Sequence, residues 1–75
     1  MQRYKNLDHG SGVTAFEVSD DAITVEFING SIYEYDYASA GRGNIERMKR
    51  LAAEGRGLST FISQRVHDAY ARRLR

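Results

Sequence analysis

Residues 23–37 read Ile-Thr-Val-Glu-Phe-Ile-Asn-Gly-Ser-Ile-Tyr-Glu-Tyr-Asp-Tyr, two alternating runs that meet at Asn29-Gly30. Alternation of β-branched and aromatic residues with polar ones is typical of a half-buried strand, and Asn-Gly between two such runs predicts a β-hairpin. This stretch decides the fold class, because it requires an antiparallel sheet. It does not identify a reaction.

The register of the hairpin follows from which side chains share a face. A two-residue turn would place Val25 opposite Glu34 and would break both apolar faces. A three-residue loop over residues 28–30, with Gly30 in the left-handed bulge position, keeps one face apolar and aromatic throughout. We predict this second register. Its pairs are Phe27 with Ser31, Val25 with Tyr33, and Ile23 with Tyr35.

Length and composition limit the class of protein. Seventy-five residues predict one domain, residues 1–75, which buries only about 60% of the surface that its unfolded chain exposes. The sequence has no cysteine and two histidines, so we expect no disulfide, no metal centre and no cofactor. No run approaches the ~20 apolar residues of a membrane span, and the first residues lack the apolar stretch of a secretion signal. We therefore expect a cytoplasmic protein.

The segment before the hairpin predicts one further strand. Residues 1–12 should be an irregular lead-in, with Tyr4 and Leu7 covering an end of the core. Residues 13–19 alternate and predict a strand that Asp20 and Asp21 turn back onto the next one. The outer face of the three strands carries mostly acidic side chains. The inner face collects Phe16, Val18, Ile23, Val25, Phe27, Tyr33 and Tyr35, with Tyr37 at its end.

Two amphipathic helices are predicted to cover that inner face, because a three-stranded meander with one apolar face cannot stand alone. After a connector over residues 38–43, Asn44 should cap a helix over residues 45–54 that Gly55 ends in the left-handed conformation. Ser59 should cap a second helix that runs to the C-terminus. The apolar stripes are Ile45, Met48, Leu51 and Ala52 in the first helix, and Leu58, Phe61, Ile62, Val66, Ala69, Tyr70 and Leu74 in the second.

The order of elements predicts the architecture. Strands followed by helices indicate an α+β fold, here a three-stranded antiparallel β-meander followed by two helices packed on one face. The C-terminal Arg72, Arg73 and Arg75 suit the end of a helix because they oppose its dipole. Arg65 falls within the apolar stripe of the second helix, so either its stem lies along apolar surface or its head meets a carboxylate such as Glu54 or Asp36.

Charge is divided unevenly along the chain. Residues 1–38 carry seven acidic and two basic side chains, whereas residues 39–75 carry nine basic and three acidic ones. Such asymmetry indicates an anionic partner for the basic half. Attraction between the two halves within one fold explains the same asymmetry, and both explanations stay open at this point.

The order of the motifs resembles a known family. Val-Glu-Phe-Ile-Asn-Gly-Ser-Ile-Tyr-Glu-Tyr, followed after a helix by Gly-Arg-Gly-Leu-Ser-Thr-Phe-Ile, is similar to the KTSC domain, which occurs at the C-terminus of some lysyl-tRNA synthetases and as a small stand-alone bacterial protein. The likeness runs from about Ser11 to Tyr70. After Tyr35 this chain departs from the family's frequent Val-Pro. The matching positions, mainly structural, are Phe27, Gly30, Tyr33, Tyr35, Gly55, Gly57, Phe61 and Ile62.

Two functions are compatible with these features. The resemblance implies a domain without an established activity, for which attachment to a tRNA-charging enzyme suggests RNA binding. RNA requires cations for its phosphates, and the basic half offers Arg42, Arg47, Lys49, Arg50, Arg56 and Arg65. The alternative is a protein-interaction or homo-oligomerising module that uses an edge strand or the apolar residues Ile28 and Ile32.

Catalysis is not predicted. Asp8 and His9 are adjacent, but neighbours in a glycine-flanked segment have no fixed geometry. Ser59 is expected to serve as a cap, and His67 is expected on the solvent side of its helix. Residues 41–44, Gly-Arg-Gly-Asn before a helix, resemble an anion-binding turn but lack the Lys-Ser/Thr of a phosphate-binding loop, so connector glycines explain them better. We expect no enzymatic activity.

Overall fold

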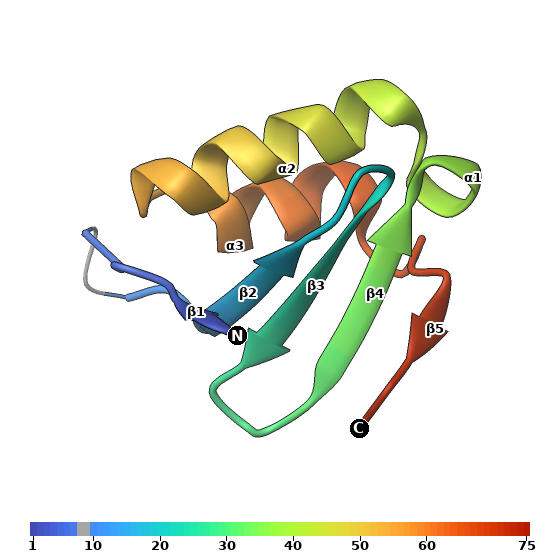
Figure 1. Cartoon of the computed structure of the whole chain (residues 1–75). Helices are drawn as coiled ribbons and strands as arrows, with labels where there is room; N and C mark the ends of the chain where they lie inside the picture. The colour runs from blue at the N-terminus through green and yellow to red at the C-terminus, as the bar shows by residue number, and fades with distance from the viewer. Residues whose placement is uncertain (8–9) are drawn as a thin grey trace.

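The computed structural model describes residues 1–7 and 10–75, so the adjacent pair Asp8-His9 lies outside the described residues. Five antiparallel strands form one sheet in chain order, and Figure 1 shows α2 and α3 on one face of it. An α+β fold with an antiparallel sheet is thus confirmed, whereas the expected number of three strands is wrong. The strands are β1 (Gln2–Arg3), β2 (Val13–Val18), β3 (Ala22–Phe27), β4 (Ile32–Asp36) and β5 (Arg72–Arg73). The helices are α1 (Tyr37–Ala40), α2 (Arg42–Glu54), α3 (Leu58–Phe61) and the π-helical segment η1 (Ile62–Val66).

The predicted register of the central hairpin is confirmed. Val25 pairs with Tyr33 and Ile23 pairs with Tyr35. The backbone N–H of Phe27 donates to the carbonyl oxygen of Ser31 at 2.8 Å, and this hydrogen bond closes the three-residue loop between them. Within the loop, Gly30 has φ 90°. A side chain with a Cβ rarely adopts this φ, which is why glycine suits the position.

β2 pairs with β3 so that Phe16 lies opposite Val25 and Val18 lies opposite Ile23, which places them on the predicted inner face. Ile23 and Val25 are fully buried, while Val18, at the end of its strand, is 47% exposed. The inward face of the sheet therefore forms the floor of the core, except at this end.

The N-terminal lead-in is more ordered than expected. Gln2 and Arg3 form the edge strand β1, paired with Phe16 and Ala15 of β2. Two polar residues are too short a run to show the alternation that predicts a strand. The pairing forms because it satisfies backbone hydrogen-bonding groups on the edge of β2. Tyr4 covers the core as predicted, and its hydroxyl oxygen accepts a hydrogen bond from the backbone N–H of Leu58 at 3.3 Å.

The connector over residues 38–43 is the second difference, because most of it is helical. α1 begins after Asp36, whose carboxylate accepts from the backbone N–H of Ser39 at 2.8 Å, while the Ser39 hydroxyl oxygen accepts from the Asp36 backbone N–H at 3.0 Å. α2 begins at Arg42, so Asn44 is not its cap. The amide of Asn44 instead donates to the carbonyl oxygen of Ala40 at 2.8 Å.

Glycines separate α2 from α3. Gly55 ends α2 in the left-handed conformation, with φ 79°, as predicted. Gly57, also left-handed, precedes α3, and no side chain caps this helix, so the expected role of Ser59 is wrong. Because both glycines adopt positive φ, the chain reverses within the three residues 55–57 and α3 returns along the sheet.

The C-terminal segment departs most from the prediction. The expected second helix ends at Val66, and His67 has φ 45°, a rare conformation for a residue with a Cβ. The chain then turns back to the sheet, where Arg72 and Arg73 pair with Glu34 and Tyr33 of β4. The open edge of β4 offers backbone partners that outweigh helix propensity here. The arginines therefore meet the sheet and not a helix end.

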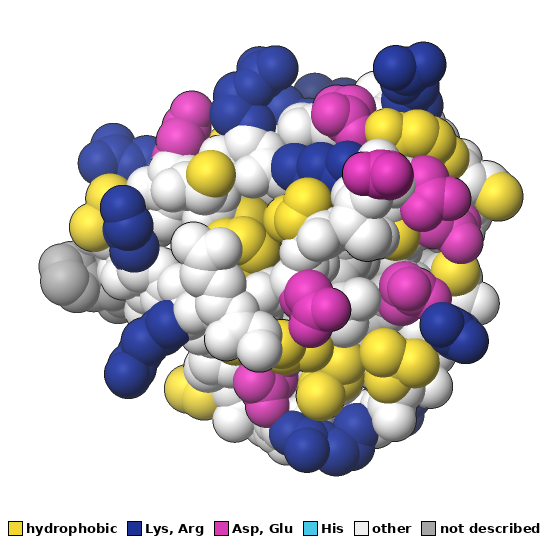
Figure 2. Space-filling view, viewed as in Figure 1, with side chains coloured by type: hydrophobic (Ala, Val, Ile, Leu, Met, Phe, Trp, Pro, Cys, Tyr) yellow, Lys and Arg dark blue, Asp and Glu magenta, His cyan; other side chains and the backbone are white. Residues whose placement is uncertain are grey.

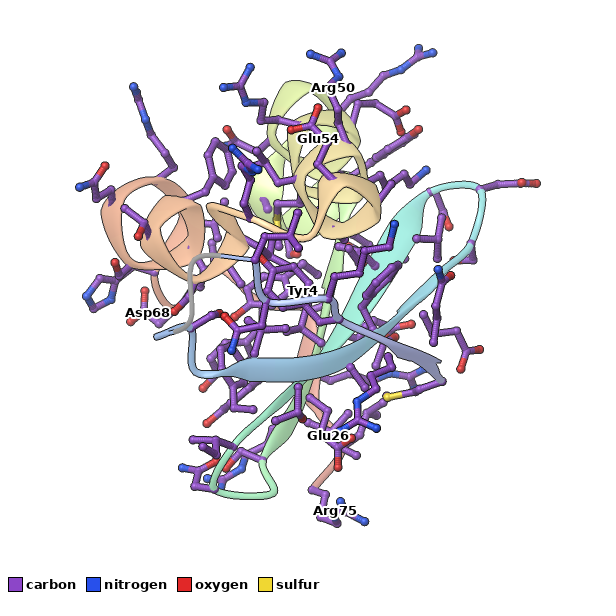
Figure 3. All side chains as sticks on the ribbon, turned by 90° about the vertical axis from the view of Figure 1, so that its left-hand side faces the viewer. Tyr4, Glu26, Arg50, Glu54, Asp68 and Arg75 are labelled. Atoms are coloured by element: carbon purple, nitrogen blue, oxygen red, sulfur yellow. The ribbon has the colours of Figure 1, made fainter. Side chains whose placement is uncertain are left out.

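Both layers contribute to one core. Figure 3 shows Tyr4 between the sheet and the helices. No helix in residues 1–7 or 10–75 has the length and apolar character needed to cross a bilayer. The buried cluster comprises Tyr4, Val13, Phe16, Ile23, Val25, Tyr35, Ile45, Met48, Ala52, Leu58, Ile62 and Val66.

Candidate functional site

A groove with two arginines lies between α2 and the α3–η1 segment. Its volume is about 640 Å³. Glycine turns reverse the chain after α2, and this reversal places Arg47 of α2 and Arg65 of η1 on the walls of the same groove. We call this surface the arginine groove; it is lined by Asn44, Arg47, Gly57, Thr60, Phe61, Gln64 and Arg65.

The chemistry of the arginine groove suits an anion beside an aromatic group. Both guanidinium groups are exposed, and no carboxylate lines the groove among the described residues. Planar guanidinium groups match the geometry of phosphate oxygens. Phe61 is half-buried and leaves part of its ring at the groove. The amides of Asn44 and Gln64 supply further hydrogen-bonding groups.

Arg65 does not have the position that its sequence pattern predicted. Its side chain is exposed, and it forms no ion pair with Glu54 or Asp36. The π-helical geometry of η1 explains the difference, because i→i+5 spacing rotates side chains away from the face expected of an α-helix.

Lys49, another predicted cation, has a structural position. Its ammonium group donates to Glu46 Oε2 at 2.9 Å and to the backbone oxygen of Asp20 at 2.7 Å, which ties α2 to the β2–β3 turn. The hydroxyl of Tyr37 donates to the same Glu46 oxygen at 2.6 Å. This hydrogen bond, followed by that from Lys49, lowers the pKa of Glu46, and the Glu46 carboxylate raises the pKa of both donors.

The other three predicted cations lie around α2 but outside the arginine groove. Arg42 lies over the Tyr37 ring, with Cζ 5.7 Å from the ring centre. Arg50 points away from the sheet beside Glu54, as Figure 3 shows. Arg56 is exposed in the link between α2 and α3. The structure thus brings together only Arg47 and Arg65 of the six cations.

The uneven charge along the chain has a partly structural use. Arg72 Nε lies 2.7 Å from Glu34 Oε1, and Arg75 Nη2 lies 2.8 Å from Glu26 Oε2. Both ion pairs join the basic half to the acidic half across the open face of the sheet. Figure 2 shows basic side chains along the upper rim, over α2, with acidic and apolar side chains between them. Internal pairing accounts for these two C-terminal arginines but not for those of the arginine groove.

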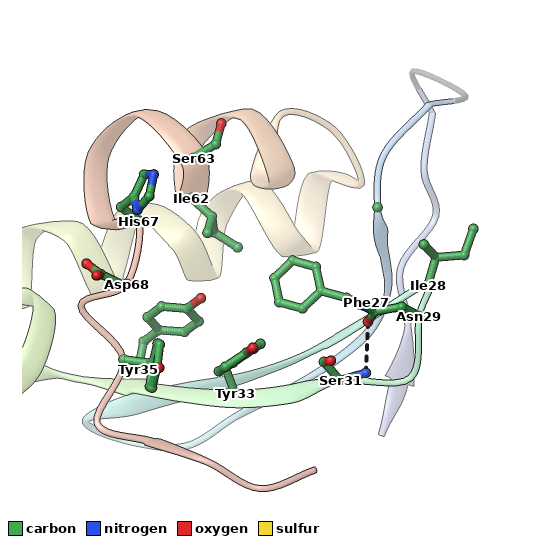
Figure 4. Close-up of a pocket in the computed structure, with 12 residues that line it drawn as sticks. Phe27, Ile28, Asn29, Ser31, Tyr33, Tyr35, Ile62, Ser63, His67 and Asp68 are labelled. Atoms are coloured by element: carbon green, nitrogen blue, oxygen red, sulfur yellow. Dashed lines mark hydrogen bonds between the residues drawn. The ribbon is translucent and has the colours of Figure 1, made fainter.

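A second groove, with several aromatic rings, lies at the open end of the core between the hairpin loop and η1. Its volume is about 560 Å³. Figure 4 shows Phe27, Tyr33 and Tyr35 rising from the strands toward Ile62 of η1. We call this surface the tyrosine groove; its walls include Phe27, Tyr33, Tyr35, Ile62, Asp68 and Tyr70.

The rings of the tyrosine groove contact one another at an angle. The Tyr33 ring centre lies 4.7 Å from that of Tyr70 and 5.8 Å from that of Phe27. Tyr35 is the most buried of the three tyrosines, and burial, with smaller effects of the charges of Tyr33 and Tyr70, raises its pKa to about 12. The prediction that these tyrosines lie beneath the helices is therefore correct for Tyr35, while Tyr33 is only half-buried.

Six of the eight positions on which the predicted family resemblance rests line one of the two grooves. Phe27, Tyr33, Tyr35 and Ile62 line the tyrosine groove, and Gly57 and Phe61 line the arginine groove. The role of Tyr70 as a groove wall was not found from the sequence, because its place in an apolar stripe predicted a helical core residue. No family model, curated protein or solved structure matches the chain.

Proposed function

We propose that this domain binds RNA through the arginine groove. The observation that carries the proposal is the presence of Arg47 and Arg65 in one groove with an aromatic ring and with no carboxylate among its described lining residues. Proteins that bind single-stranded nucleic acid use cations along the phosphate backbone and aromatic rings on which the bases stack. RNA offers both groups, whereas a free anion would use only the arginines.

The opposite face of the sheet offers RNA much less. Its outward side chains include Glu26 and Glu34, and their charges are compensated by Arg75 and Arg72. That face therefore has little net attraction for phosphate. The proposed contact is on the helical layer, as the distribution of cations in the sequence predicts.

Membership of the KTSC family and a cytoplasmic location stay predictions of the sequence. They support the proposal, because a domain that resembles a module of tRNA-charging enzymes would act close to RNA. The α+β fold and the position of the motif residues around two grooves are compatible with the predicted family membership.

Salt dependence of the affinity tests the proposal. Binding of a fluorescent single-stranded RNA is measured by anisotropy over a series of salt concentrations. Each neutralised phosphate contributes about 0.7 to the slope of log K against log salt, so Arg47→Ala with Arg65→Ala should reduce that slope by about 1.4. The matched control, Arg3→Ala with Lys5→Ala, removes the same charge from the N-terminal segment, outside the arginine groove, and should leave most of the slope intact. Equal losses in the two double variants would contradict a specific role of the groove.

The protein-interaction alternative has one observation in its favour. Ile28 is 77% exposed at the tip of the hairpin loop. Ile32 is half-buried and its backbone is paired with Leu74 and Arg75, so its side chain offers a partner less open surface than that of Ile28. Sedimentation at high concentration checks this function, and a concentration-dependent dimer that Ile28→Ser abolishes would favour it over RNA binding.

A further inference from the structure

We propose that the tyrosine groove receives an unpaired nucleobase of the bound RNA. This inference rests on the proposed function, and it assigns to each groove a different part of a nucleotide. The arginine groove would hold phosphate, and the tyrosine groove would hold a base.

The walls of the tyrosine groove have the composition of a pocket for an aromatic ligand. Its volume of about 560 Å³ falls within the range of about 300–1,000 Å³ for small-molecule sites. Tyr70 lies at its mouth and is 38% exposed, with its ring centre 6.3 Å from that of Tyr35 at an interplanar angle of 88°. Because these rings are not stacked in parallel, a planar guest can meet a ring face without displacing a stacked partner.

Polar groups at the rim suit the edge of a base. Asn29 accepts from the backbone N–H of Ser31 through its side-chain oxygen at 3.0 Å, which leaves its NH₂ group as a donor. Asp68 supplies a carboxylate acceptor on the other side of the groove. A base carries donors and acceptors on more than one edge, so each of the two groups can meet a complementary edge.

The charges near the tyrosine groove select a base over the alternatives. Asp68 lines it, and no lysine or arginine does so among the described residues, which disfavours phosphate there. A cationic ammonium ligand would suit the rings, but the Arg73 guanidinium already lies 5.5 Å from the Tyr33 ring centre and would repel it. With a carboxylate in its wall and a guanidinium beside one of its rings, the groove favours an uncharged ligand, and the rings themselves favour an aromatic heterocycle.

The two grooves lie on either side of one short segment. Ser63 lines the tyrosine groove and the next residue, Gln64, lines the arginine groove. A helical segment is about 10–12 Å wide with its side chains, so a strand of a few nucleotides can cross η1 from one groove to the other. His67, which has a positive φ at the end of η1, turns the chain so that Asp68 and Tyr70 reach the tyrosine groove.

Nucleosides without phosphate isolate this groove from the arginine groove. Adenosine, guanosine, cytidine and uridine are titrated separately into the ¹⁵N-labelled protein, and backbone amide shifts are followed by NMR. At least one nucleoside should give saturable shifts confined to the hairpin loop and residues 67–71. Tyr70→Leu should weaken this binding about tenfold, whereas Tyr70→Phe, which keeps the ring, should retain it.

The outcomes separate this inference from the proposed function. Nucleoside binding should be unchanged in the Arg47→Ala with Arg65→Ala variant, because that variant alters only phosphate contacts. A reduced RNA salt slope without nucleoside binding would overturn the base site and leave the RNA proposal standing. Saturation of the same residues by choline but by no nucleoside would also overturn it, in favour of an ammonium ligand. Nucleoside binding with an unchanged salt slope would instead overturn the arginine groove.

Discussion

The raised pKa of Tyr35 predicts a loss of stability at alkaline pH. A comparison of wild type with Tyr35→Phe over a range of pH can measure this loss. Burial raises this pKa from 10.0 to about 12, because the ionised phenol is poorly solvated beneath the helices. In the unfolded chain the Tyr35 phenol loses its proton near pH 10. Between this pH and the folded pKa, the folded protein therefore keeps a proton that the unfolded chain has lost. The free energy of unfolding therefore falls as pH rises, and the fall is complete only above the folded pKa.

The magnitude follows from the two pKa values. Linkage gives a loss of about 1.3 kcal/mol between pH 9 and pH 11 and at most about 2.7 kcal/mol at still higher pH. A domain of this size has roughly 4–11 kcal/mol of stability, so the loss is measurable without unfolding the protein. Tyr35→Phe removes the titrating group and keeps the ring, so this variant should lack that part of the pH dependence.

Urea unfolding, followed by circular dichroism at pH 9, 10 and 11, measures the effect. The difference in unfolding free energy between wild type and Tyr35→Phe should change by about 1.3 kcal/mol over this range. Tyr70→Phe serves as the control, since the Tyr70 charge is the smallest of the three causes of the shift. Parallel pH profiles for wild type and Tyr35→Phe would refute the burial of this phenol, and with it the inward orientation of the tyrosine face.

Two further predictions concern stability. Gly55→Ala should lower the unfolding free energy by more than about 1 kcal/mol, because Gly55 has φ 79° and an added Cβ would lie 2.6 Å from Lys5 Cβ. Gly43 lies in α2, with nothing within 4 Å of an added Cβ, so Gly43→Ala should raise the unfolding free energy by up to about 1 kcal/mol. Thermal unfolding measures both variants, and a shift in the same direction for the two would contradict the argument. The hydrogen bonds from Tyr37 and Lys49 lower the pKa of Glu46 below 4.5, so their stabilisation is present above that pH and is lost as pH falls through the folded pKa. Melting temperatures between about pH 6 and pH 3 should decline more steeply in wild type than in Glu46→Gln, and equal declines would show that these bonds do not persist in solution.

The central hairpin was predictable because several local features agree. Alternation placed Val25 and Ile23 on one face, and Gly30 supplied the positive φ that a three-residue loop needs. Only one register satisfied both requirements. Gly55 was predictable for a similar reason, since a glycine after an amphipathic run commonly ends a helix in the left-handed conformation.

The edge strands were not predictable, because their formation depends on backbone groups far away in the sequence. Gln2–Arg3 and Arg72–Arg73 pair with β2 and β4 across separations that no local pattern records. Among the six predicted cations, sequence spacing indicated a basic helical half but not which arginines share a groove. That juxtaposition of Arg47 with Arg65 depends on the reversal at two glycines and on the π-helical turn of η1.

The end of η1 shows why the sequence did not predict the tyrosine groove. Val66, Ala69 and Tyr70 have helical spacing, and a continuous helix would have placed all three on the core face. The chain leaves the helix at His67 instead, at a cost of about 1–3 kcal/mol for the sparsely populated backbone conformation of this residue. Pairing with the edge of β4, with ion pairs to Glu34 and Glu26, offsets this cost. Because Tyr70 then reaches Tyr33 from a loop, its ring forms the wall of an open groove and not a filled core.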